Sequence, residues 1–213
     1  DGNEAENVYR LLSLDEIPSK IDFLASLGIS AIKAEEHLPV DFRKTIIEEA
    51  NKRGLPVVGH SRDAVESINA GMRFIEHTYP IARSLATDRE LAYKLGRTSE
   101  YLMDLSKVPA FIDLMLEKEV YFNPTLLGRF GYLSERRVQY SKEEKELLSG
   151  ELFQAIPEEF RSAIPDSYLR AETMPAEEKK RHEKGYENVK LLIQEFSSKG
   201  GLLLAGSDAT QFR

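Results

Sequence analysis

The sequence has no cysteine and no tryptophan among its 213 residues, and it has no long apolar run. Without cysteine there is no disulfide framework, no zinc ribbon and no thiol nucleophile. No apolar stretch approaches the ~18 residues that a membrane span needs, so we expect none. The 36 acidic residues outnumber the 29 basic ones, which argues against a nucleic-acid partner. We therefore expect a soluble globular protein of unknown compartment, an enzyme or a small-molecule binder, long enough to bury a core.

Short apolar runs alternate with helical patterns along the chain. We predict strands at residues 29–34, 55–59, 73–76, 120–126 and 202–205. Helices are predicted to begin near Ser13, Pro39 and Arg62 and to end at glycines, and a further helical region covers 85–118. Strands and helices at this spacing indicate right-handed crossovers and a parallel sheet, which is an α/β fold.

The stretch between Thr125 and Leu202 is too long for one crossover helix. Residues 128–185 are rich in Glu, Lys and Arg, with scattered aromatic residues. We predict that they form a helical insertion over the carboxyl ends of the strands, followed by a helix over 186–198; the alternative is a mobile charged excursion. His182 has charged neighbours on both sides, so we expect it to be solvated.

Four chemically capable residues stand where the predicted strands end, namely Lys33, His60, His77 and Asp208. In a parallel α/β barrel the catalytic groups come from the carboxyl ends of different strands and meet on one face. Neutral imidazoles with a carboxylate suit zinc or a similar divalent ion. Each residue alone has an ordinary interpretation as a loop histidine, a turn aspartate or a solvated lysine. Four at corresponding positions favour a metal site.

These strand ends also resemble a known family. The segments are Ile32-Lys33-Ala34, Val58-Gly59-His60-Ser61, Ile75-Glu76-His77 and Ala205-Gly206-Ser207-Asp208-Ala209. Together they resemble the metal-dependent amidohydrolase superfamily, in particular the branch of imidazolonepropionase-related dipeptidases and carboxypeptidases that includes Xaa-Pro dipeptidase-like enzymes. The resemblance covers residues ~13–126 and 186–210. It implies a (β/α)8 TIM barrel of which this chain holds the fourth to eighth strands, with the helical insertion between the last two.

The resemblance also implies a site and a reaction. Lys33 matches a lysine that is carboxylated by CO2 and bridges two metal ions, and His60 and His77 match the ligands of the more exposed ion. Asp208 matches an aspartate that binds the buried ion and moves the proton from water to the leaving amine. The implied activity is hydrolysis of an amide bond in a dipeptide or N-acyl amino acid by water activated by one or two divalent ions, such as zinc.

A substrate with a free carboxylate needs a cation or hydroxyl donors. By loop position the candidates are Tyr79, Arg83 and Arg129, and His37 follows Lys33 in the same loop. The expected partner is thus a small molecule or a peptide, and homo-oligomerisation stays open.

The sequence departs from the family pattern in two ways. After His77 it has Thr78-Tyr79-Pro80 instead of a small residue, which narrows the pocket or adds a hydroxyl to it. The His-x-His pair of the family's first strand is absent, and so are the first three barrel strands. We therefore expect residues 1–213 to be the C-terminal part of a longer barrel. Two alternatives stay open: a non-catalytic half-barrel that serves as a binding or assembly module or is inactive, and a lactonase or phosphotriesterase on the same scaffold.

Overall fold

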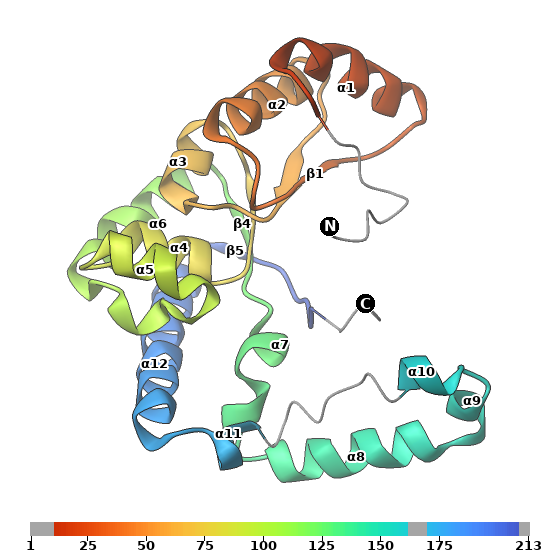
Figure 1. The fold of residues 1–213 in the computed structure, drawn as a ribbon. Coiled ribbons are helices and arrows are strands. Elements are labelled where there is room, and N and C mark those ends of the chain that lie inside the picture. The colour runs from red at the N-terminus through yellow and green to blue at the C-terminus, as the bar shows by residue number, and fades with distance from the viewer. Residues whose placement is uncertain (1–10, 162–169, 209–213) are drawn as a thin grey trace.

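Short parallel strands organise the computed structural model, which describes residues 11–161 and 170–208 (Figure 1). The first sheet pairs β1 with β2, and Lys33 lies opposite Val58. The second sheet has the order β3-β4-β5, also parallel. The strand bounds are Ile32–Ala34 (β1), Val57–Gly59 (β2), Phe74–Glu76 (β3), Tyr121–Asn123 (β4) and Leu202–Leu203 (β5). The prediction of an α/β fold with parallel strands is therefore confirmed, although each strand is shorter than its apolar run.

No closed barrel forms from the described residues. β2 and β3 are neighbours in space, but the hydrogen-bonded ladders stop between them and leave two separate sheets. Leu202, Leu203 and Leu204 keep 38–41% of their surface exposed, although apolar strands of a parallel sheet are normally covered on both faces. The barrel implied by the resemblance is thus present only as an open arc of strands.

Helices within the first 117 residues cover the sheets (Figure 1). Ile47 on α2, Ile75 on β3 and Phe122 on β4 are almost completely buried in one core cluster. The helix bounds are Ile17–Ser26 (α1), Val40–Lys52 (α2), Ala64–Asn69 (α3), Tyr79–Leu85 (α4), Arg89–Leu95 (α5) and Val108–Glu117 (α6), with 3-10 turns at Leu14–Glu16 (η1), Gly96–Thr98 (η2), Glu100–Leu102 (η3) and Leu105–Lys107 (η4).

The predicted helical region over 85–118 is mainly helical in the structure, but it is not one continuous helix. Gly96 adopts a positive φ of 61° that ends α5, and Asp88 and Asp104 each accept a backbone N–H that begins a new turn. Ala86 and Met103 form an antiparallel bridge across the interruption. The region is therefore a helix, a run of 3-10 turns and a second helix, because polar capping residues outweigh the apolar periodicity.

Between β4 and β5 the described chain is mainly helical, and α8, α9 and α10 project away from the sheets (Figure 1). The last helix begins at Ala176, ten residues before its predicted start, and runs back to the second sheet. No helix among the described residues is both long and apolar enough to cross a membrane. The bounds are Leu126–Phe130 (α7), Gly131–Leu133 (η5), Arg137–Ser149 (α8), Glu151–Gln154 (α9), Glu158–Arg161 (α10), Arg170–Thr173 (α11) and Ala176–Ser198 (α12).

The expectation that His182 is solvated is wrong. Its side chain is 4% exposed, and its Nδ1 forms a hydrogen bond with the hydroxyl of Tyr132 in η5. The charged neighbours in sequence point elsewhere because a helix distributes consecutive residues around its axis. His182 therefore serves the packing of α12 against η5.

A buried carboxylate, Glu100 in η3, joins the loops after β3 and β4. Its Oε1 accepts hydrogen bonds from the Thr78 hydroxyl at 2.8 Å and from Arg129 Nε at 3.0 Å. On the other side, Asn188 of α12 donates to the Glu100 carbonyl oxygen at 3.0 Å. The segment Thr78-Tyr79-Pro80 was expected to narrow a pocket or to add a hydroxyl to it, and the Thr78 hydroxyl is instead hydrogen-bonded to the buried Glu100.

A second buried carboxylate, Asp63, holds the loop after β2. It caps α3 by accepting the backbone N–H of Glu66 at 3.0 Å, and it accepts the Ser84 hydroxyl of α4 at 2.9 Å. Its other oxygen accepts from Arg89 at 2.6 Å and from the Tyr93 hydroxyl at 3.1 Å. One carboxylate therefore ties three helices to the end of β2.

The tight contact between β1 and β2 predicts that Gly59 cannot be replaced. Its φ is 114°, and a Cβ there would lie 2.8 Å from the Ala34 carbonyl oxygen. We expect Gly59→Ala to lower the free energy of unfolding by roughly 2 kcal/mol or more, from left-handed strain plus a backbone clash. The control Gly28→Ala, at φ 76° with nothing within 4 Å, should lose only about 1 kcal/mol. Equal losses in urea denaturation would contradict the role of the clash.

The buried Glu100–Arg129 pair predicts a large stability effect. The side chains of Glu100 and Arg129 are 3% and 15% exposed, so Glu100→Gln leaves a nearly buried guanidinium without its counter-charge. We expect a loss of about 3 kcal/mol in the free energy of unfolding, measured by urea denaturation. The matched control Glu90→Gln breaks an exposed pair with Lys94 and should change stability little. Similar effects for both variants would show that the buried pair is not an anchor.

Candidate metal centre

The structure brings the four sequence-predicted residues to one place at the carboxyl ends of the strands. Lys33 lies on β1, and its Nζ is 3.2 Å from Oε2 of Glu76, the last residue of β3. The imidazole rings of His60 and His77 have centroids 4.7 Å apart. Asp208, beyond β5, has Oδ2 3.9 Å from His77 Nδ1. Residues separated by up to 175 positions along the chain therefore share one small volume.

The backbone of this region is strained at three neighbouring positions. His77, Thr125 and Asp208 have φ values of 67°, 46° and 51°, which is the left-handed region that residues other than glycine seldom adopt. Each such residue costs about 1–3 kcal/mol and persists only where its surroundings hold it. Strain of this kind concentrates at active sites and ligand clamps, and here it concentrates beside the two histidines.

Each histidine is oriented through its Nδ1 atom. Glu35 Oε2 lies 3.1 Å from Nδ1 of His60, and the Thr125 hydroxyl lies 2.7 Å from Nδ1 of His77. A carboxylate at Nδ1 favours the tautomer with its hydrogen there, which directs the lone pair of His60 Nε2 toward the site. That Nε2 is 3.7 Å from Glu76. Outer partners of this kind accompany metal-binding histidines in proteins.

Sequence reasoning missed Glu76 and the two orienting residues, Glu35 and Thr125. Glu76 belongs to the segment Ile75-Glu76-His77, in which the family resemblance assigns a role to the histidine alone. The structure shows that His60, Glu76 and His77 each offer a ligand atom and that these atoms lie within 4.8 Å of one another. The signal that could have found Glu76 is its position at the carboxyl end of a strand, the same signal that singled out the histidines.

Lys33 is more exposed than its sequence suggests. Ile32 and Ala34 on either side are 9% and 2% exposed, whereas the Lys33 side chain is 51% exposed. Side chains alternate along β1, so Lys33 points to the open side of the first sheet. Glu76 of the second sheet lies on that same side, next to Lys33. Its ammonium group is solvated and paired rather than buried.

Tyr79 and Arg83, predicted to bind substrate, both hold Glu36 in the loop after β1. The Tyr79 hydroxyl donates to Glu36 Oε2 at 2.9 Å, and Arg83 Nη1 donates to Oε1 at 2.6 Å. Burial raises the pKa of Glu36, but the hydrogen bonds from Arg83 and Tyr79 outweigh it and leave the pKa below its ordinary value. The ring of Tyr79 also stacks against His77, with centroids 5.6 Å apart. Glu36 therefore fixes a ring that supports a candidate ligand.

The two other predicted substrate residues lie in different surroundings. Arg129 pairs with Glu100 through two nitrogen atoms, at 3.0 and 3.2 Å. His37 is exposed in the loop after β1, next to Glu36. Their contact with a substrate stays a prediction.

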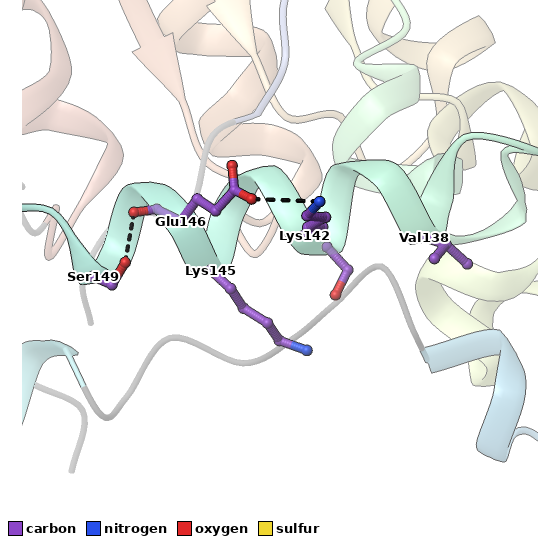
Figure 2. A pocket seen from close by; sticks show the side chains of 6 residues that line it. Val138, Lys142, Lys145, Glu146 and Ser149 are labelled. Atoms are coloured by element: carbon purple, nitrogen blue, oxygen red, sulfur yellow. Dashed lines mark hydrogen bonds and ion pairs between the residues drawn. The ribbon is translucent and has the colours of Figure 1, made fainter.

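A surface depression elsewhere does not contain any of these residues. It lies along one face of α8, where Lys142 pairs with Glu146 at 3.7 Å, and its lining comes from that helix alone (Figure 2). A groove on one exposed helix has no convergent polar groups from other elements, which binding sites normally have. The strand ends are therefore the better candidate.

Comparison with known proteins found no matching family model and no matching curated protein. Among solved structures, bottromycin amidohydrolase matches with a TM-score of 0.56 and 18% identity, over 98% of this chain and 44% of its own. A Xaa-Pro dipeptidase with bound methionine matches with a TM-score of 0.43 and 17% identity, over 97% and 43%. Ochratoxinase from A. niger matches with a TM-score of 0.46 and 17% identity, over 92% of this chain and 35% of its own.

This chain thus spans less than half the length of the structures that it matches. At such identities the likeness concerns the fold alone, and the match to bottromycin amidohydrolase carries it. The resemblance seen in the sequence is therefore confirmed at the level of fold alone: the described chain shares the α/β architecture of part of bottromycin amidohydrolase.

Proposed function

We propose that this chain is part of a metal-dependent hydrolase that cleaves an amide bond in a dipeptide or N-acyl amino acid with metal-activated water. The observation that carries the proposal is the meeting of two imidazoles and two carboxylates around the left-handed residues His77 and Asp208. The fold shared with bottromycin amidohydrolase supports the reaction class. In this proposal the five strands correspond to the fourth to eighth of a (β/α)8 barrel, and residues 128–185 are its insertion.

The donor set fits a divalent ion. Neutral imidazoles and carboxylate oxygens are ligands that zinc accepts, and we propose His60, His77 and Asp208 among them. A further anionic oxygen comes either from a carboxylated Lys33, as the resemblance implies, or from Glu76, which is 3.2 Å from Lys33 Nζ. When bound, such an ion lowers the pKa of a water ligand and polarises a carbonyl group.

In this proposal Asp208 is the residue that moves the proton. Its carboxylate is half-exposed, so it can accept a proton from water and return it to the departing nitrogen. The loop that carries it is fixed by α7, since Gly128 N donates to the Ser207 carbonyl oxygen at 3.1 Å. A Cβ on Gly128 would lie 2.7 Å from that oxygen and 3.2 Å from Asp208 Cβ. Gly128 therefore permits the close approach that positions Asp208.

For the substrate, we propose that Tyr79, Arg83, Arg129 and His37 line the side of the site away from the strands. Arg83 and Arg129 already pair with Glu36 and Glu100, so a substrate carboxylate that binds either arginine must share its guanidinium group with a protein carboxylate or displace that carboxylate. Such displacement is costly, which favours a substrate anion that shares the guanidinium rather than displaces its partner.

The proton role of Asp208 predicts a rate effect without unfolding. An amide cannot accept the proton, so Asp208→Asn should lower kcat on a hydrolysed dipeptide by about 10²–10⁴-fold. The control Asp113→Asn changes an exposed aspartate that pairs with Lys199 and should leave kcat unchanged. The measurement is turnover of a dipeptide panel beside a lactone panel, with metal content determined for each variant.

Three outcomes would contradict the proposed function. Turnover of lactones only would reject the amide-cleaving reaction. Zinc content that is zero in the wild-type chain, or fully retained in a His60→Ala/His77→Ala double variant, would reject the metal site.

A further inference from the structure

Glu76 occupies a position in the site that the family resemblance leaves without a role. It is the last residue of β3, its side chain is 25% exposed, and its Oε2 lies 3.2 Å from Lys33 Nζ and 3.7 Å from His60 Nε2. With His60 and His77 it forms a set of three ligand atoms within 4.8 Å of one another. Within the described chain, this is the group of histidine and acidic side chains with metal-binding geometry.

The backbone explains how adjacent residues reach the same site. Successive side chains of a strand point to opposite faces, so Glu76 and His77 would ordinarily diverge. β3 keeps this alternation up to Glu76: Ile75 is 1% exposed on the core side, whereas Phe74 and Glu76 are intermediate. At His77 the φ of 67° ends the extended conformation. The left-handed residue therefore brings a neighbouring carboxylate and imidazole together.

The three donors make a complete zinc ligand set by themselves. Two imidazoles and one glutamate, with open positions left for water or substrate, form a common type of catalytic zinc site. Zinc–ligand bonds of about 2.0–2.1 Å place tetrahedral donors about 3.3 Å apart, so side-chain movements of roughly 1–1.5 Å close the set. No covalent change to Lys33 is needed to supply the anionic oxygen.

We infer that Glu76, rather than a carboxylated Lys33, supplies the anionic oxygen to an ion bound by His60 and His77. Lys33, as an ammonium group, orients the Glu76 carboxylate. The ion pair of 3.2 Å between Lys33 Nζ and Glu76 Oε2 agrees with this role. The inference rests on the proposed function and specifies the ligands of its metal.

The test is metal binding by the full chain, stripped with a chelator and titrated with Co²⁺, with the visible absorption spectrum as readout. Titrations are run in CO2-depleted buffer and again with bicarbonate. We expect one ion per chain and the same affinity in both buffers. Glu76→Gln should weaken binding by about 100-fold or more, and Glu76→Asp, which keeps the charge, by less. Lys33→Met should weaken binding by about 10-fold, the lower end of what the loss of an outer partner costs.

The control Glu119→Gln alters an exposed carboxylate that pairs with Arg73 and should bind like wild type. Far-UV circular dichroism checks that each variant folds. Binding that requires bicarbonate, or that is lost in Lys33→Met and kept in Glu76→Gln, overturns the inference and leaves the proposed function intact. Wild-type chain that binds no Co²⁺ in either buffer overturns both.

Discussion

The removal of three carboxylates from water, the buried Asp63 and Glu100 and the partly buried Glu36, is the constraint on which the rest of the structure depends. A carboxylate removed from water is tolerated only when hydrogen bonds and counter-charges satisfy it, and that requirement fixes its partners closely. Two of the three bind side chains of α4, and Glu100 binds Thr78 immediately before it. Every residue of α4 is buried as a result. The loops after the strands are thus held by specific polar contacts, whereas the strands themselves are only two or three residues long.

These anchors explain why strained backbone persists beside the histidines. His77 is followed by Thr78, whose hydroxyl is held by Glu100, and by Tyr79, whose hydroxyl is held by Glu36. With the chain fixed on its C-terminal side and β3 paired with β4 on the other, His77 has little freedom to relax to an extended conformation. The hydrogen bonds of the Glu100 and Glu36 carboxylates therefore offset a local cost of about 1–3 kcal/mol and keep the imidazole in the site.

Sequence patterns identified what depends on local order and missed what depends on side-chain partners. Apolar runs gave the five strands, and their ends gave Lys33, His60, His77 and Asp208, because parallel strands necessarily bring their carboxyl ends together. Nothing in the sequence distinguishes the buried Glu100 from the exposed Glu90, since partners such as Arg129 are distant along the chain. His182 was predicted to be a surface residue for the same reason, because its partner Tyr132 is distant along the chain. Glu76 was missed because strand alternation should point it away from His77, and only a left-handed φ cancels that rule.

For the proposed metal site, charge balance connects the chemical state of Lys33 to the number of ions that can bind. By formal charge, the carboxylates of Glu35, Glu76 and Asp208 and the ammonium group of Lys33 leave two negative charges around the proposed site. One divalent ion neutralises them. Carboxylation would turn Lys33 from a cation into an anion and leave four negative charges, which two divalent ions neutralise. Because uncompensated charge of one sign is unfavourable at such short distances, the ammonium form matches one ion and the carbamate form matches two. The ion pair between Lys33 and Glu76 is the arrangement suited to a single ion.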